Sequence, residues 1–407
     1  MHLKDFNCRP QSPADYHPLS KQLIKQLREE DSDVVIFGAQ GLGGVILNAL
    51  VSNNISVTCF CDNLPPDSKW LHGLLCLNPS DAAVKYPDAV YILSALEPST
   101  CQAMRDQITS LIFDANTCFW DVIYYQYIIS RRGVDKDLFA EALWSFWGYG
   151  QIEKLTITSL SLRITSRCTL KCRDCSFLVP FQPERSDFPL EEITMSLRYF
   201  CKMVDGILDL TIHGGETFLY SDFVSLINEI VCLPKIINIV IVTNGTIIPT
   251  GEVLRLCADN AIRIRVSEYG EHSSKVDELR EKCKEYGVSV SDFQRIRKWF
   301  DIGTTKHNRD DNQNRIIAEN CPFNDGKNKR ILGLYKGGIY LCARYDGLSA
   351  CGYISGEYYS DLRFDLRDNS KKEEFWKFLE GTSLYKLCDF CNWPMDEIPP
   401  GVQLEEE

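Results

Sequence analysis

The chain has 407 residues, of which 56 are acidic and 44 basic, and its formal net charge is −12. This acidic balance argues against a nucleic-acid partner, because binding to a phosphate backbone depends on clustered lysines and arginines. The length is sufficient for two or three domains. No apolar run is long enough to span a membrane, and the first residues lack the apolar core of a signal peptide. We therefore expect a cytoplasmic protein without a membrane partner.

The first 130 residues have the pattern of an α/β domain. Residues 33–38 form an apolar strand pattern that leads into a glycine-rich loop, residues 38–44, and then into a helical pattern. A second strand pattern ends at Asp62, as in the strand–loop–helix–strand–acid layout of a nucleotide-binding fold. The glycine spacing, G-x-x-G-x-G-G, differs from the dinucleotide fingerprint. It fits phosphate binding at a helix N-terminus and a simple tight turn equally well.

This segment also resembles, loosely, the N-terminal domain of the sugar O- and N-acyltransferases. In that family a similar glycine loop and a strand-end aspartate hold a nucleotide-sugar. We therefore expect residues 1–130 to form a Rossmann-like domain of a nucleotide- or nucleotide-sugar-binding type. Residues 131–155 are rich in aromatic side chains and are predicted to form a helical bridge.

Strand and helix patterns alternate from Leu160 onward. The strand patterns are at residues 160–165, 207–213, 237–243, 262–267 and 288–291. The helical patterns are at residues 190–204, 222–232, 251–260 and 274–286. Repeats of this length predict parallel βα units, in which chemistry takes place at the carboxyl ends of the strands. We expect one barrel-like domain over residues 156–310.

Three cysteines, Cys168, Cys172 and Cys175, follow the first of these strands. The chain has eighteen cysteines, and because thiols stay reduced in the cytoplasm this number indicates metal ligation rather than disulfide bonds. A loop with the CxxxCxxC spacing can ligate three irons of a [4Fe–4S] cluster and leave the fourth iron open to a small molecule. The alternatives are plain burial of the thiols or zinc, which usually takes its ligands in pairs.

Polar motifs follow the next strands in turn. After the second strand come Gly214, Gly215 and Glu216. The glycines allow a backbone to approach a ligand closely, and the carboxylate can accept a hydrogen bond from an ammonium group. Asn244 lies at the end of the third strand, and Ser267 lies at the end of the fourth.

This order of motifs resembles the radical S-adenosylmethionine superfamily, with CxxxCxxC, GGE and TNG at successive strand ends. The resemblance implies a partial (β/α)6 barrel in which one electron from the [4Fe–4S] cluster cleaves S-adenosylmethionine to a 5′-deoxyadenosyl radical. It also implies an electron donor such as flavodoxin or ferredoxin. The residues implied to bind S-adenosylmethionine are Gly214, Gly215, Glu216, Asn244 and Ser267. Thr217 replaces the family's usual proline, and Asp174 stands where an aromatic residue is common.

The last 90 residues carry four more spaced cysteines. Residues 330–342 predict a β-hairpin, and a helical pattern over residues 371–384 leads into a CxxC pair. The spacing resembles the CX₉₋₁₅GX₄C signature that opens a SPASM or twitch extension, here residues 311–407. The resemblance implies an auxiliary [4Fe–4S] cluster with the ligands Cys321, Cys342, Cys388 and Cys391. Only Cys351 remains nearby, so the shorter twitch form fits better; a zinc site with four cysteines is the alternative.

A fully ligated cluster suits electron transfer, which favours a net oxidation of the substrate. The twitch family includes a dehydrogenase of a deoxy-inosamine. Together with the first domain, this favours a carbohydrate-type substrate (a sugar, nucleotide-sugar or cyclitol) that is dehydrogenated or epimerised at a carbinol carbon. The candidate proton acceptors are His213, Arg265, Glu268 and Tyr269. Cys351 is either a hydrogen-atom donor, as in radical epimerases, or a filler of the core.

Two other functions stay open. A peptide maturase is the rival enzyme, although the first domain does not look like a peptide-recognition domain. An iron–sulfur electron carrier is the alternative that is not an enzyme. Glu216 and Asn244 argue against it, because a carrier needs no methionine clamp.

Overall fold

The computed structural model describes residues 9–30, 32–39, 41–147, 155–292, 299–303, 306–321, 331–335, 337–342, 344–354, 363–380, 385–392 and 394–405. Two compact units make up the chain. The first comprises residues 1–152, 257–263 and 287–291, and the second comprises residues 153–256, 264–286 and 292–407. The predicted boundary at residue 155 lies close to the division after residue 152.

The first unit contains a six-stranded sheet with the order β3-β4-β2-β1-β5-β6. All its pairs are parallel except that of β3 with β4, so the predicted α/β fold is confirmed. The strands are β1 (Val34–Phe37), β2 (Cys59–Cys61), β3 (Trp70–Leu71), β4 (Leu74–Leu77), β5 (Val90–Leu93) and β6 (Asn116–Phe119). The helices are α1 (Tyr16–Glu29), α2 (Leu42–Val51), α3 (Pro79–Lys85), α4 (Pro98–Leu111), α5 (Trp120–Ile129) and α6 (Lys136–Phe146). Helix α6 occupies the segment predicted as a helical bridge.

Tight packing accounts for glycines in the loop between β1 and α2. Gly38 has a φ of +101°, and a Cβ atom there would lie 2.3 Å from the carbonyl oxygen of Ser94. A Cβ atom at Gly43 would lie 2.2 Å from the carbonyl oxygen of Gly38. The Asp62 carboxylate accepts a hydrogen bond of 2.9 Å from the backbone N–H of Ala39. The strand-end acid thus holds the loop itself, which favours the tight-turn interpretation over phosphate binding.

The second sheet has eight strands in the order β11-β10-β9-β8-β7-β13-β14-β15. Strands β7, β8 and β9 are parallel to one another, as predicted. The strands after β6 are β7 (Thr156–Arg163), β8 (Gly206–His213), β9 (Ile236–Thr243), β10 (Arg263–Val266), β11 (Val290–Asp292), β12 (Trp299–Phe300), β13 (Ile331–Tyr335), β14 (Gly338–Tyr340), β15 (Arg363–Asp365) and β16 (Glu397–Ile398). The helices after α6 are α7 (Leu190–Met203), α8 (Phe223–Val231), α9 (Gly251–Asp259), α10 (Val276–Tyr286), α11 (Asp311–Glu319), α12 (Tyr345–Ala350), α13 (Lys372–Glu380) and α14 (Tyr385–Cys388).

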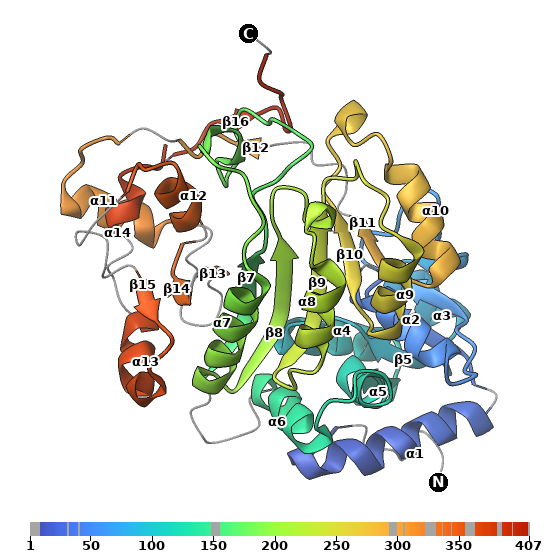
Figure 1. Ribbon diagram of the computed structural model, residues 1–407. Coiled ribbons are helices and arrows are strands. Elements are labelled where there is room, and N and C mark those ends of the chain that lie inside the picture. The colour runs from blue at the N-terminus through green and yellow to red at the C-terminus, as the bar shows by residue number, and fades with distance from the viewer. Residues whose placement is uncertain are drawn as a thin grey trace. The chain divides into compact units, whose positions relative to one another are not determined.

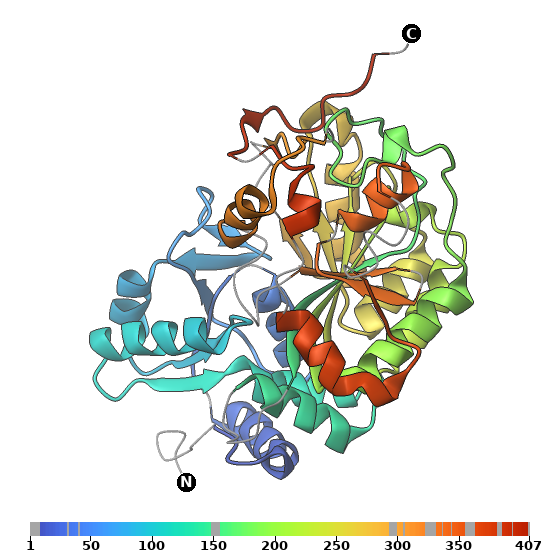
Figure 2. The same cartoon turned by 90° about the vertical axis from the view of Figure 1, so that its left-hand side faces the viewer.

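Helices α7 and α8 lie side by side along one face of strands β7 to β9 (Figure 1) and are seen from another side in Figure 2. Each helix turns an apolar stripe inward, for example Leu197 and Phe200 on α7, both fully buried. With helices on this face, the other face and the carboxyl ends of the strands are available for a site, as is usual for parallel βα units.

The predicted hairpin is confirmed as β13 and β14, which pair antiparallel on either side of Gly337. Gly337 has a φ of +69°, a conformation that favours glycine. Strand β13 also pairs in parallel with β7, with Leu332 opposite Leu160. The cysteine-rich extension therefore continues the sheet of the preceding domain.

A buried ion pair joins the end of β7 to helix α12. Arg163 and Asp346 are 2.9 Å apart, with side chains only 3% and 8% exposed. The Arg163 guanidinium also donates a hydrogen bond of 3.1 Å to the side-chain oxygen of Gln182. Helix α12 approaches so closely that a Cβ atom at Gly347 would lie 2.6 Å from the carbonyl oxygen of Phe177. These contacts hold the loop after β7 against the extension.

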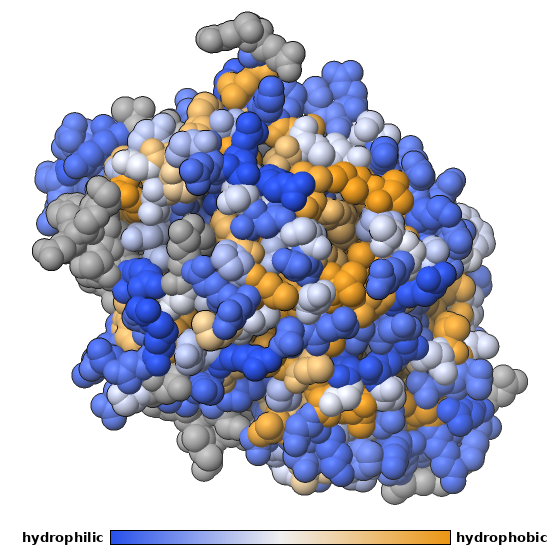
Figure 3. Space-filling model, in the orientation of Figure 1, coloured by the Kyte–Doolittle hydropathy of each residue, from blue (hydrophilic) through white to orange (hydrophobic). Residues whose placement is uncertain are grey.

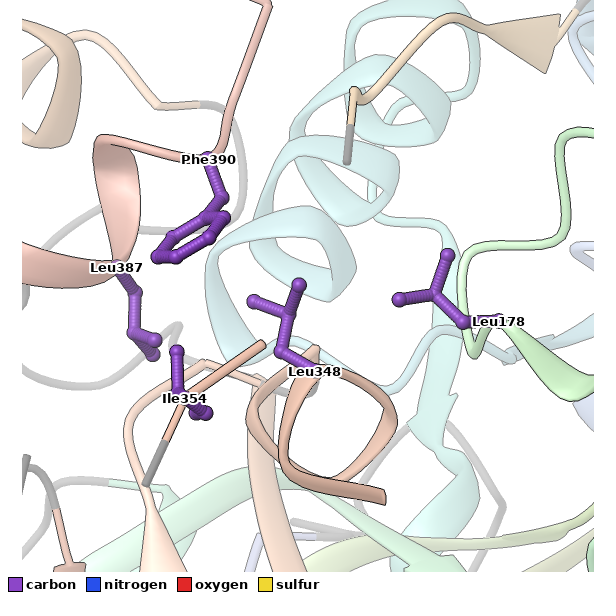
Figure 4. Close-up of a cluster of buried hydrophobic side chains, with 5 residues drawn as sticks. All are labelled: Leu178, Leu348, Ile354, Leu387 and Phe390. Atoms are coloured by element: carbon purple, nitrogen blue, oxygen red, sulfur yellow. The ribbon is translucent and has the colours of Figure 1, made fainter. Parts of the chain in front are cut away.

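A hydrophobic cluster reinforces the same junction. Its side chains come from the loop after β7, from α12 and its C-terminal end, and from α14 and the residues after it (Figure 4). The cluster consists of Leu178, Leu348, Ile354, Leu387 and Phe390. Burial of such side chains stabilises the fold by about 1.5–3 kcal/mol each.

Hydrophilic side chains cover most of the face seen in Figure 3, with hydrophobic residues in small groups between them. Among the described residues, no helix has the length and apolar character needed to cross a membrane.

We predict that Gly38→Ala lowers the free energy of unfolding by roughly 2–5 kcal/mol, because it adds both a left-handed backbone penalty and a clash with Ser94. Gly73→Ala is the matched control. Gly73 also has a positive φ, +80°, but a Cβ atom there meets nothing within 4 Å. Its cost should be about 1 kcal/mol. Urea denaturation measures the free energy of unfolding of both variants. Equal losses in the two variants would contradict the explanation that Gly38 is required by its close contact with Ser94.

We further predict that Asp346→Ala destabilises the protein by about 3–5 kcal/mol, because it leaves the buried Arg163 guanidinium without its counter-charge. The control is Glu319→Ala, which removes an exposed ion pair with Arg315 on α11, 4.0 Å apart. This change should cost at most about 1 kcal/mol. Denaturant titrations measure the free energy of unfolding of the two variants. A loss of at most about 1 kcal/mol in Asp346→Ala would show that the buried ion pair does not stabilise this junction.

Candidate active site

One cavity of about 550 Å³ lies in the second unit. It is lined by every cysteine that the sequence predicts as a metal ligand: Cys168, Cys172, Cys175, Cys321, Cys342, Cys388 and Cys391. Groups that are more than two hundred residues apart in the sequence therefore share one space. The described lining contains no further cysteine.

The first three cysteines lie on the loop that follows β7. Backbone hydrogen bonds fold this loop tightly, for example from the N–H of Cys175 to the carbonyl oxygen of Cys172 at 3.3 Å. Burial raises the pKa of the Cys168 thiol to about 12, and the negative charges of Glu216, Cys175 and Cys172 act in the same direction. Three thiolates can share this space only if positive charge offsets their repulsion, which iron supplies. The donor set thus fits an iron–sulfur cluster.

Gly214 and Gly215 hold the start of this loop. A Cβ atom at Gly215 would lie 2.2 Å from the carbonyl oxygen of Arg167 and 2.7 Å from the Cβ atom of Cys168. A Cβ atom at Gly214 would lie 2.6 Å from the Thr165 methyl group. Both glycines also line the cavity. The close approach predicted for a ligand is thus already made by the backbone of the cysteine loop.

Glu216 is fully buried and connects two strand ends. Its carboxylate accepts hydrogen bonds of 2.8 Å from the Thr243 hydroxyl and from the backbone N–H of Asn244, and one of 3.2 Å from the N–H of Phe218. Burial raises the pKa of this carboxyl, and the hydrogen bonds oppose that shift. The side chain fixes the end of β9 beside the end of β8. It is not part of the described cavity lining, so contact with a methionine amine stays a prediction.

Asn244 and Ser267, both predicted to bind the cofactor, line the cavity. The Asn244 side-chain amide donates to the Thr169 hydroxyl at 3.1 Å and lies 3.7 Å from the sulfur of Cys168. The N–H of Ser267 donates to the carbonyl oxygen of Thr243 at 2.8 Å. The structure therefore brings the motif residues of three strand ends together around the first cysteine.

The predicted catalytic residues separate into two groups. Tyr269 lines the cavity, and burial raises its pKa, with the nearby cysteine charges acting in the same direction. Glu268 instead pairs with Arg280 at 2.9 Å and is not in the described lining. Cys351 is not in that lining either; it packs against the hydrophobic cluster, with its sulfur 3.8 Å from the carbonyl oxygen of Leu178. This position agrees with the core-filler alternative for Cys351.

A polar wall at the strand ends includes two of the proposed proton acceptors, His213 and Arg265. The His213 ring hydrogen-bonds through Nε2 to the Ser161 hydroxyl, and its buried Nδ1 has no hydrogen-bond partner. Burial, followed by the charges of Arg163 and Arg265, lowers the His213 pKa to about 3. The imidazole is therefore neutral across the physiological range.

The same wall contains residues that the sequence analysis missed, namely Ser159, Ser161 and Thr211. They alternate with apolar residues along β7 and β8, and this alternation was the available signal, because alternate residues of a strand share a face.

The cysteines of the second group are partly buried and lie near one another. Burial raises the pKa of the Cys342 thiol to about 12, and the charges of Cys391 and Cys321 raise it further. Burial and the other three cysteines raise the pKa of Cys388 in the same way. The buried Arg344 guanidinium donates a hydrogen bond of 3.3 Å to the sulfur of Cys391. Within the described part of the chain, no three His, Cys, Asp or Glu side chains converge as the ligands of a single metal ion do.

Two curated proteins are similar to short stretches of this chain. Molybdenum cofactor biosynthesis protein 1 of Drosophila melanogaster is 32% identical over 93 residues, which are 22% of this chain and 16% of that protein. GTP 3′,8-cyclase of Moorella thermoacetica is 33% identical over 91 residues, which are 22% of this chain and 28% of that protein. The chain thus spans less than a third of the length of these relatives.

Two solved structures show weaker similarity. Streptococcus suis SuiB has 21% sequence identity and a TM-score of 0.27, over 33% of this chain and 32% of that one. BtrN has 17% identity and a TM-score of 0.34, over 63% of this chain and 98% of that one.

The family comparison covers the part of the site around the first three cysteines. Residues 162–269 match the Radical SAM superfamily. This range contains the cysteine loop, the glycine pair, Glu216, Asn244 and Ser267. Residues 162–269 of this chain are therefore a radical SAM domain.

Proposed function

We propose that Cys168, Cys172 and Cys175 hold a [4Fe–4S] cluster and that S-adenosylmethionine binds beside it. When bound, this pair supplies a 5′-deoxyadenosyl radical that abstracts hydrogen. Asn244 and Ser267 line the cavity next to the cysteine loop and are the side chains available to the cofactor. A flavodoxin or ferredoxin would be the reducing partner.

We propose that Cys321, Cys342, Cys388 and Cys391 hold a second [4Fe–4S] cluster. The observation that carries the proposal is that these four thiols and the first three line one cavity. Four protein ligands leave no open iron, so this cluster would supply an electron acceptor or donor rather than a substrate site. The cation of Arg344 beside Cys391 supports the same assignment, because it offsets thiolate charge.

The substrate in this proposal is carbohydrate-like: a sugar, nucleotide-sugar or cyclitol. Support comes from the polar wall, where the hydroxyls of Ser159, Ser161 and Thr211 stand with His213 and Arg265 at one side of the cavity. Hydroxyl-rich molecules need such partners, since a buried hydroxyl without a hydrogen bond is costly. Oxidation to a carbonyl is favoured over epimerisation, because every cysteine in the described lining already belongs to one of the two proposed cluster sites.

We predict about eight irons per chain in the reconstituted protein, and about four in Cys168→Ala and in Cys388→Ala. Cys168→Ala should lose cleavage of S-adenosylmethionine, whereas Cys388→Ala should keep the cleavage and lose the oxidised product. Cys232→Ala, which removes an exposed thiol outside both groups, is the control and should behave like the parent. Zinc in place of the second four irons would contradict the proposal of a second cluster. Cleavage of S-adenosylmethionine by Cys168→Ala would contradict the assignment of the first cluster to the triad.

We predict that nucleotide-sugars, sugars or cyclitols, incubated in D₂O with the reduced enzyme and S-adenosylmethionine, yield a carbonyl product without deuterium at the reacting carbon. Mass spectrometry distinguishes the outcomes. Deuterium at that carbon would indicate epimerisation instead. Turnover of peptides alone would replace the carbohydrate proposal with a peptide maturase, and no turnover of any class would favour an electron carrier.

A further inference from the structure

Residues 401–404 run antiparallel to the cysteine loop. The backbone N–H of Arg173 donates to the carbonyl oxygen of Val402 at 2.8 Å, and the N–H of Leu404 donates to the carbonyl oxygen of Lys171 at 2.9 Å. Cys172 and Gln403 are the paired residues of this bridge. A segment more than two hundred residues away in sequence is thus fastened to the loop that carries the first cluster site.

The Gln403 side chain uses both ends of its amide on this loop. Its oxygen accepts a hydrogen bond of 2.7 Å from the backbone N–H of Lys171. Its nitrogen donates one hydrogen bond of 2.5 Å to the carbonyl oxygen of Gly401 and one of 3.3 Å to the sulfur of Cys172. The amide is therefore held in one orientation, and the N–H group that is not used by the Gly401 carbonyl oxygen is directed at the sulfur. The other side-chain amide near the triad, that of Asn244, is 3.7 Å from the sulfur of Cys168.

The segment is fixed before it reaches the loop. Strand β16 pairs antiparallel with β12, which places Ile398 opposite Trp299. Gly401 then turns the chain with a φ of +69°, and a Cβ atom there would lie 2.8 Å from the Cβ atom of Tyr269. The same short stretch therefore contacts two residues of the cavity lining, Tyr269 and Cys172.

We propose that Gln403 is a positioning residue of the first cluster site and that its N–H donor makes the cluster easier to reduce. The proposal rests on the assignment of Cys168, Cys172 and Cys175 as ligands. Reduction adds negative charge to a cluster and its sulfurs, and a fixed N–H group stabilises that charge. Because the donor atom belongs to a side chain, it can be removed while the backbone bridge stays.

The test is the midpoint potential of this cluster, measured by electron paramagnetic resonance during an anaerobic redox titration of the full chain. The signal is assigned to the first cluster by its loss in Cys168→Ala. We expect Gln403→Ala to lower the midpoint potential with the iron content unchanged. Gln403→Glu keeps the size of the side chain but replaces the donor with a carboxylate, and it should lower the potential at least as far. Leu404→Ala keeps the backbone bridge and the amide, and its potential should equal that of the parent.

An unchanged potential in Gln403→Ala and Gln403→Glu, each with a full cluster, would overturn the proposal. Equal shifts in Gln403→Ala and Leu404→Ala would also overturn it, since the segment would then act by packing alone. A parent chain that binds no cluster through the triad would instead refute the proposed function, so the two failures are distinguishable.

Discussion

The placement of seven thiols around one cavity is the constraint on which the rest of this site depends. Burial disfavours the thiolate form, and each neighbouring thiolate disfavours it further, as the raised pKa values of Cys168, Cys342 and Cys388 show. Such a cavity gains little stability from the cysteines themselves. It becomes favourable when cations offset the sulfur charges, and two groups of three and four thiols match the needs of an open and a closed iron–sulfur cluster.

A cavity of this kind needs loops that do not move, and the structure fixes them from several sides. Gly215 lets the backbone at Arg167 lie against the end of β8, and Glu216 fixes the end of β9 beside it. The buried pair of Arg163 and Asp346 joins the end of β7, just before the triad loop, to the helix that follows Cys342. Hydrogen bonds from surrounding groups then orient the sulfurs, which is how outer contacts tune a metal site.

Local motifs made much of this site predictable from the sequence. The cysteine triad and the glycine pair each lie within a short stretch of the sequence. Their spacing therefore indicates their chemistry without knowledge of the fold. Glu268 shows where adjacency misleads: Ser267 and Tyr269 line the cavity, and the residue between them pairs with Arg280 outside the described lining.

Arg344 and Gln403 show a second limit of the sequence. Their roles depend on hydrogen bonds to cysteines 47 and 231 residues away, and no local pattern records such pairs. The pairing of β13 with β7 belongs to the same class, because parallel strands joined by a long connection leave no turn signal.

The cavity also limits how a hydroxyl group could be oxidised within it. Arg265 is a cation and cannot take a proton, and Glu268 lies outside the described lining. The phenol of Tyr269 stays protonated because burial raises its pKa. His213 is neutral and has an unpaired, buried Nδ1, so it alone among the four candidates offers a nitrogen lone pair that no group in the described structure occupies. Burial, and after it the charges of Arg163 and Arg265, lower its pKa to about 3, so the imidazole is a weak but unprotonated base.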